Sequence, residues 1–150
     1  SFKDVFFTER KRLRKEDIDS WIELHEVYND VIDVMKNLHD QGRLLIATMK
    51  DGESVKLILK KNGIKILTEN ILDQSQISSK LEALNHFLTY KKIQKEGLCF
   101  IDDNITHLIE PSKNNYNVYL SGWGNTMEEH KKIAKKESIP IMEIINERSF

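Results

Sequence analysis

Two acidic side chains directly follow a run of apolar residues in the second half of the chain. Residues 98–101 read Leu-Cys-Phe-Ile, and Asp102 and Asp103 come next. An unbroken apolar run of this length is typical of a strand covered on both faces, as in a parallel sheet. Ligands of open α/β sheets bind just beyond the carboxyl ends of the strands. Two carboxylates at such an end repel each other, and a hard divalent cation such as Mg²⁺ would relieve the repulsion.

The same two acids also allow a simpler interpretation. Asn104 is a favourable N-cap residue for a helix over residues 105–110. One carboxylate would then support the start of this helix, and the other would be solvated. From this stretch alone, both interpretations stay open.

Two other polar side chains are expected at the same edge of the sheet. Thr48 ends the apolar run 44–47. Lys80 falls on the first turn of a predicted helix, because Ser79 and Glu82 form a capping box. A hydroxyl, a cation and a metal-binding acid pair are the groups that stabilise a phosphoryl group, whose oxygens share negative charge. The pattern therefore indicates phosphoryl chemistry.

The hydrophobic pattern predicts a layered scaffold that can position these side chains. Helices and strands alternate along the chain, which favours an α/β domain with a mostly parallel sheet. The predicted strands cover residues 44–48, 64–67, 98–101, 117–120 and 139–145. A helix precedes each of them, and Gly42 suits the end of the first. Pro111 is expected to stop the helix that begins at Asn104.

Length and composition bound the class of protein. The chain has 150 residues, 39% hydrophobic and 31% charged, with a net charge of -1, so no strong global field attracts nucleic acid or an anionic membrane. No apolar run reaches the roughly 18 residues that span a bilayer. The single cysteine, Cys99, lies inside the apolar strand and is expected to be a buried thiol. These features favour a cytoplasmic protein without nucleic-acid or membrane partners.

With these motifs in this order, the chain resembles the haloacid dehalogenase (HAD) superfamily, whose members are mostly Mg²⁺-dependent phosphatases. The resemblance covers about residues 28–145 and implies a Rossmann-like three-layer core. Thr48 resembles the hydroxyl residue of the second motif and Lys80 the lysine of the third. Asp102 and Asp103 resemble the acids of the fourth motif, and Lys80 and Asp103 lie 23 positions apart, as suits the family.

The resemblance implies a site and a reaction. Thr48, Met49 and Lys80 would bind the phosphoryl group of a small phosphorylated substrate, and Asp103, helped by Asp102, would hold Mg²⁺. Thr48, Lys80 and Asp103 would be the catalytic residues that this chain contributes. The reaction implied is hydrolysis of a phosphomonoester through an aspartyl-phosphate.

Two departures from the family pattern lead to further expectations. The fourth motif usually has a second acid four positions after the metal-binding one, and His107 stands there. The first motif, an Asp-x-Asp after an apolar strand, is not found: Asp4-Val5-Phe6-Phe7-Thr8 has Phe6 at the position of the second acid. We therefore expect the central strand and its nucleophile to lie in an N-terminal segment absent from this chain.

The expected organisation follows from that missing strand. Residues 1–27 would be the tail of a helical cap or a linker, and residues 28–150 the core. The missing nucleophile and His107 also favour an alternative, a non-catalytic module that binds a phosphorylated ligand or a partner protein. A different reaction on the same fold, such as phosphoryl transfer or dehalogenation, stays open as well.

Overall fold

The computed structural model describes residues 4–8, 25–49, 51–122 and 128–143. Its strands are β1 (Asp4–Thr8), β2 (Leu44–Ala47), β3 (Ile71–Leu72), β4 (Leu98–Asp102), β5 (Asn117–Ser121) and β6 (Ile141–Met142). Its α-helices are α2 (His25–Asp40), α3 (Gly52–Lys61), α4 (Lys80–Lys91), α5 (Ile109–Lys113) and α6 (Glu128–Lys136). Short 3₁₀ turns η3 (Thr68–Asn70), η4 (Lys95–Gly97) and η5 (Ile105–His107) complete the described elements.

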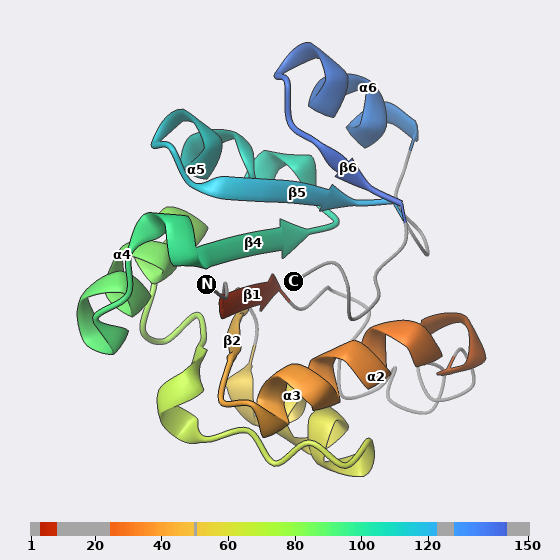
Figure 1. Ribbon diagram of the computed structural model, residues 1–150, viewed down its shortest axis with the longest axis vertical. Helices are drawn as coiled ribbons and strands as arrows, with labels where there is room; N and C mark the ends of the chain where they lie inside the picture. The colour runs from red at the N-terminus through yellow and green to blue at the C-terminus, as the bar shows by residue number, and fades with distance from the viewer. Residues whose placement is uncertain (1–3, 9–24, 50, 123–127, 144–150) are drawn as a thin grey trace.

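The strands form one parallel sheet in the order β3-β2-β1-β4-β5-β6. β1 lies in its centre, where Phe6 is paired with Leu45 on one side and with Phe100 on the other (Figure 1). The expectation that the central strand lies outside this chain is therefore wrong, and Asp4–Thr8 belongs to the core sheet. The sequence pattern missed β1 because it is short and is followed by a dense run of charged residues.

Helices cover both faces of the sheet and make three layers (Figure 1). On one face, α2 and α3 pack against alternate strand residues such as Leu44, Ile46 and Ile101. On the other face, α4, α5 and α6 pack against Leu45, Phe100 and their neighbours. Because successive strand side chains point to opposite faces, one apolar run such as β4 supplies both cores.

Several predicted local signals are confirmed. Gly42 follows α2 with a φ of 70°, the left-handed conformation that favours glycine. The Ser79 hydroxyl accepts a hydrogen bond from the backbone N–H of Glu82 at 3.1 Å, so the capping box fixes the first turn of α4. Asn104 accepts from the backbone N–H of Thr106 at 3.0 Å and so caps η5. These caps set where the site side chains leave the backbone.

Two local predictions were wrong. The strand expected at residues 64–67 is a loop, because Ile64 and Ile66 are buried against α2 and α3 while Ile71–Leu72 pairs with β2 instead. Pro111 does not end a helix but lies at the third position of α5, within the first turn. The backbone nitrogen has no intrahelical partner there, so proline is tolerated.

Candidate functional site

The carboxyl ends of the three central strands bring the predicted site residues to one edge of the sheet. Thr8 ends β1, Thr48 follows β2, and Asp102 ends β4. Lys80 is the first residue of α4, and its side chain reaches back under this edge. Residues that are far apart in sequence therefore share one location, as in other open parallel sheets.

Lys80 and Asp102 form a buried ion pair. The Lys80 ammonium lies 3.5 Å from Asp102 Oδ2, and each side chain is only 3% exposed. The ammonium also lies 3.5 Å from the backbone oxygen of Ala47, at the end of β2. Removing two charges from water is costly unless each has well-placed partners. The structure therefore buries a lysine and an aspartate together at the edge of the sheet, where each depends on the other as a partner.

Asp102 also accepts hydrogen bonds from two other groups. Its Oδ2 lies 2.9 Å from Nδ1 of His107, and its Oδ1 accepts from the backbone N–H of Asn104 at 2.9 Å. Both carboxylate oxygens are thus engaged by the protein itself. Asp102 links Lys80 and His107, which come from opposite walls of the site. The sequence offered no signal for this link, because it depends on how η5 folds back over β4.

Thr48 and Met49 continue the chain from β2 into the site. Thr48 is fully buried, and its backbone N–H donates to the oxygen of Leu72 at 2.9 Å. This bond extends the pairing of β2 and β3 by one residue and holds Thr48 in line with the strand end. Met49 is half-buried and lines a pocket beside the site.

Asp103 is the acidic residue at this edge that the sequence predicts as the metal ligand. Its side chain is half-buried and follows Asp102 directly, just beyond the end of β4. Mg²⁺ takes oxygen ligands and is often held by one or two carboxylates together with water and phosphate oxygens. One carboxylate at a strand end fits that requirement. Within the described residues, no group of three His, Cys, Asp or Glu side chains gathers to form a fuller metal site.

The register of β1 decides which residue stands where the family places its nucleophile. Thr8 is paired with Ala47, and Phe7 with Ile101, so Thr8 lies level with Asp102 between the two neighbouring strand ends. Asp4 is paired with Leu98 at the opposite end of the sheet. Asp4 is therefore not a first-motif acid, and the described part of the central strand ends in a threonine at this position.

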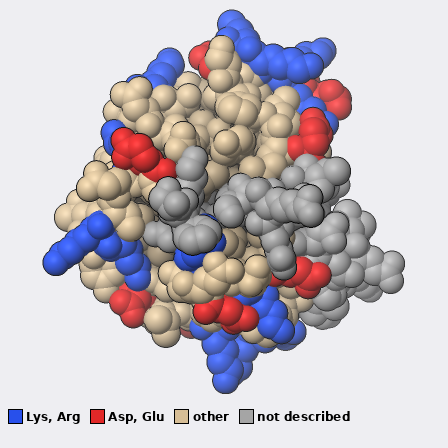
Figure 2. Space-filling model, viewed as in Figure 1, with Lys and Arg blue, Asp and Glu red and all other residues tan. Residues whose placement is uncertain are grey.

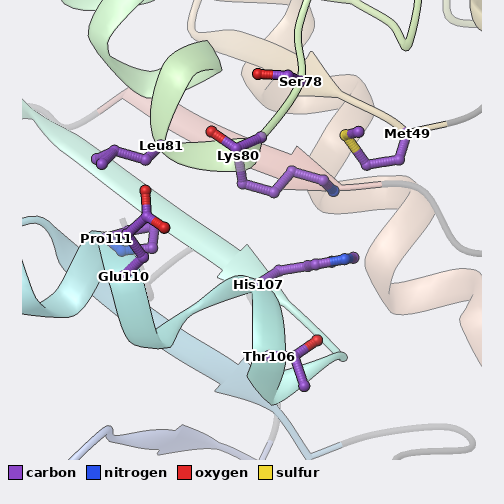
Figure 3. A pocket seen from close by; sticks show the side chains of 9 residues that line it. Met49, Ser78, Lys80, Leu81, Thr106, His107, Glu110 and Pro111 are labelled. Carbon is purple, nitrogen blue, oxygen red and sulfur yellow. The ribbon is translucent and has the colours of Figure 1, made fainter.

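A pocket of about 180 Å³ opens beside this edge (Figure 3). Its walls are formed by Met49, by the start of α4 and by the η5–α5 segment. It is lined by Met49, Ser78, Ser79, Lys80, Leu81, Thr106, His107, Glu110 and Pro111. Sequence reasoning did not single out Ser78, Thr106 or Glu110, since isolated polar residues near helix starts usually serve as caps.

One carboxylate near the pocket is held in its charged form. The hydroxyl and the backbone N–H of Ser78 both donate to Glu82 Oε2, at 2.5 and 3.1 Å. These hydrogen bonds lower the pKa of Glu82 below its ordinary value. Glu82, one turn into α4, is therefore charged at neutral pH.

The face of the molecule shown in Figure 2 has no single dominant charge. In Figure 2, basic and acidic side chains are scattered around the margin of the face shown. None of the described helices is both long and apolar enough to cross a membrane.

Comparisons with known proteins agree on one family. A family model described as haloacid dehalogenase-like hydrolase matches residues 3–120. A predicted phosphatase from Clostridium acetobutylicum has a similar structure, with a TM-score of 0.60, 14% identity, and coverage of 99% of this chain and 96% of its own. A haloacid dehalogenase-like family hydrolase from Streptococcus pneumoniae has a TM-score of 0.59 at 13% identity, covering 86% of this chain and 89% of its own. No curated protein matches the chain.

Proposed function

Because this chain belongs to the haloacid dehalogenase-like hydrolase family, we propose that it binds a small phosphomonoester with Mg²⁺ and takes part in hydrolysing it through an aspartyl-phosphate. The observation that carries the proposal is the buried Lys80–Asp102 pair at the carboxyl edge of the sheet, 3.5 Å apart. A lysine kept charged at that position is suited to an anionic ligand. The similar structure from Clostridium acetobutylicum, described as a phosphatase, supports a phosphoryl ligand over a halogenated one.

Each residue of the edge has a role in this proposal. The Lys80 ammonium attracts the phosphoryl oxygens as a point charge. The Thr48 hydroxyl and the backbone of Met49 bind the same oxygens and orient the phosphorus. Asp102 acts as a positioning residue, because its Oδ2 atom holds the Lys80 ammonium in place. Catalysis of phosphoryl transfer depends mainly on such positioning and electrostatic stabilisation.

Asp103 would hold Mg²⁺, with water and phosphate oxygens as the remaining ligands. When bound, the metal neutralises negative charge on the phosphoryl oxygens. We assign Asp102 a supporting part in metal binding at most, because both of its oxygens already accept hydrogen bonds from the protein.

The described residues do not provide the attacking carboxylate at the end of β1, where the proposed reaction needs it. In the proposed reaction a carboxylate oxygen attacks phosphorus, the ester P–O bond breaks, and the leaving alkoxide takes a proton from water. Water then cleaves the acyl phosphate. Thr8 at the end of β1 cannot form this intermediate, so in this proposal the nucleophile comes from a segment that is not part of this chain. Thr8 also favours a second candidate function, which is binding of a phosphorylated ligand without turnover.

Introducing a carboxylate at the end of β1 tests both candidates. We expect the 150-residue chain to hydrolyse para-nitrophenyl phosphate with Mg²⁺ no faster than a Lys80→Met control, and Thr8→Asp to be at least tenfold faster. A Thr8→Asn variant, which has the same shape without the nucleophilic oxygen pair, should stay at the control rate. Hydrolysis by the unchanged chain that survives in Lys80→Met would contradict the proposed site. Equal rates for Thr8→Asp and Thr8→Asn would favour the binding function.

A further inference from the structure

The chain that leads from β2 into α3 is held at two points by the end of β3. The backbone N–H of Thr48 donates to the backbone oxygen of Leu72 at 2.9 Å. The backbone N–H of Gly52 donates to Oδ2 of Asp73 at 3.0 Å, across 21 positions of the sequence. In the proposed function, Thr48 and Met49 bind the phosphoryl oxygens. The end of β3 therefore fixes the chain on both sides of Met49.

The Asp73 carboxylate is itself held in one orientation. Its Oδ1 accepts hydrogen bonds from the backbone N–H of Ser75 at 2.9 Å and from the Ser75 hydroxyl at 2.5 Å. Burial alone would raise the pKa of Asp73, but the hydrogen bonds from Ser75 and Gly52 outweigh it and lower the pKa below its ordinary value. Asp73 is therefore charged at neutral pH. Its bond with the Gly52 N–H is charge-assisted and stronger than one between neutral groups.

The contact between Gly52 and Asp73 has no room for a larger residue. Gly52 is buried, and a Cβ atom added to it would lie 2.8 Å from Asp73 Oδ2. A glycine allows the backbone to approach this closely. Helix α3 has a cap of its own, because the Asp51 side chain accepts from the backbone N–H of Glu53 at 3.1 Å. The bond to Asp73 therefore adds a link between the start of α3 and the end of β3.

From these contacts we propose that Asp73 is a positioning residue for the phosphoryl site and acts through Gly52 on the chain that carries Thr48 and Met49. This inference rests on the proposed phosphoryl site. Loss of the Asp73 carboxylate leaves the buried Gly52 N–H without this acceptor, and an unpaired buried donor is unfavourable. The chain around Gly52 then shifts to find another partner. Because phosphoryl binding depends on how its donors are placed, such a shift weakens it.

Binding of inorganic phosphate, measured calorimetrically on the full chain with Mg²⁺ present, tests the inference. We expect Asp73→Ala to bind phosphate about fivefold more weakly than the unchanged chain, which is the scale of one lost hydrogen bond. Removal of a negative charge alone would act in the opposite direction, because it favours binding of an anion. Asp73→Asn retains an oxygen that can accept from the Gly52 N–H, so it should keep most of the affinity.

Two control variants separate positioning from charge and from stability. Asp33→Ala removes an exposed acid on α2 and should leave the affinity for phosphate unchanged. Ile139→Val removes one buried methyl group next to β6, at the opposite edge of the sheet from β3. It should lower the stability in urea without changing the affinity. All affinities are compared at a temperature where circular dichroism shows each variant folded.

Gly52→Ala breaks the same contact from its other side and decides the question if Asp73→Ala does not fold. The added methyl group should displace the Asp73 carboxylate and weaken phosphate binding. In an Asp73→Ala background the same substitution should cost less affinity, because the two residues act through one contact.

The outcomes distinguish this inference from the proposed function. If phosphate binding depends on Lys80 but Asp73→Ala and Gly52→Ala bind like the unchanged chain, the positioning role is overturned and the phosphoryl site stands. A loss of affinity in Ile139→Val as large as that in Asp73→Ala would also overturn the positioning role, because reduced stability would then explain both. If the unchanged chain does not bind phosphate, both proposals are overturned.

Discussion

At the scale of single residues, Asp102 makes contacts that its position in the sequence does not indicate. The acid pair after an apolar strand predicts two metal ligands, yet Asp102 contacts Lys80, His107 and the backbone of Asn104. His107 stands where the family has a second acid, and here it supports the first acid. The metal-ligand assignments of Asp103 and Asp102 stay predictions, and the contacts of Asp102 support a part in fixing Lys80.

This role predicts a stability effect that is separate from ligand binding. Lys80→Met leaves a buried carboxylate without its nearest ammonium, and breaking such a pair typically costs about 3 kcal/mol. The double variant Lys80→Met/Asp102→Leu removes both charges and should recover part of that loss. Urea denaturation at pH 7 measures both values. A loss well below about 1 kcal/mol for Lys80→Met would show that the pair does not hold the edge of the sheet.

At the scale of elements, β1 is the strand on which the site depends, because it aligns β2 with β4. Its neighbours were predictable: the strand before Thr48, the capping box at Ser79 and the buried strand before Asp102 are confirmed. β1 was not, because a five-residue strand beside a charged run has no clear periodicity. Its position comes from pairing on both sides, which is a tertiary property that local pattern does not encode.

Proline substitution tests the central position of β1. Phe6 is paired with a strand on each side, so Phe6→Pro removes a backbone donor inside the sheet. A buried partner left without its hydrogen bond costs about 1–3 kcal/mol, in addition to the loss of the side chain. Phe6→Val is the matched control, because valine is similar in size to proline but retains the backbone N–H donor. We expect Phe6→Pro to be clearly less stable than Phe6→Val in urea denaturation, and equal stability would contradict a central β1.

At the scale of the whole molecule, the sequence was sufficient to predict the fold class and the edge of the sheet at which Thr48, Lys80 and Asp102 gather. Thr48, Lys80 and Asp102 are brought to one edge because strand ends in a parallel sheet meet there. The pocket was not predictable, because it is formed where Met49, the start of α4 and the η5–α5 segment come together in the fold. The sequence predicted a strand at residues 64–67, but the strand of the structure is Ile71–Leu72. Both runs are short and apolar, so local pattern could not choose between them.

The central claim is that the carboxyl edge of the sheet binds a phosphoryl group at Lys80, and direct binding of inorganic phosphate tests it. Calorimetric titration of the full chain with Mg²⁺ should give saturable binding at one site. Lys80→Met should bind at least tenfold more weakly at a temperature where circular dichroism shows it folded, and Lys60→Met, at an exposed lysine on α3, should bind like the unchanged chain. Absence of binding by the unchanged chain, or equal binding by Lys80→Met, would contradict the account.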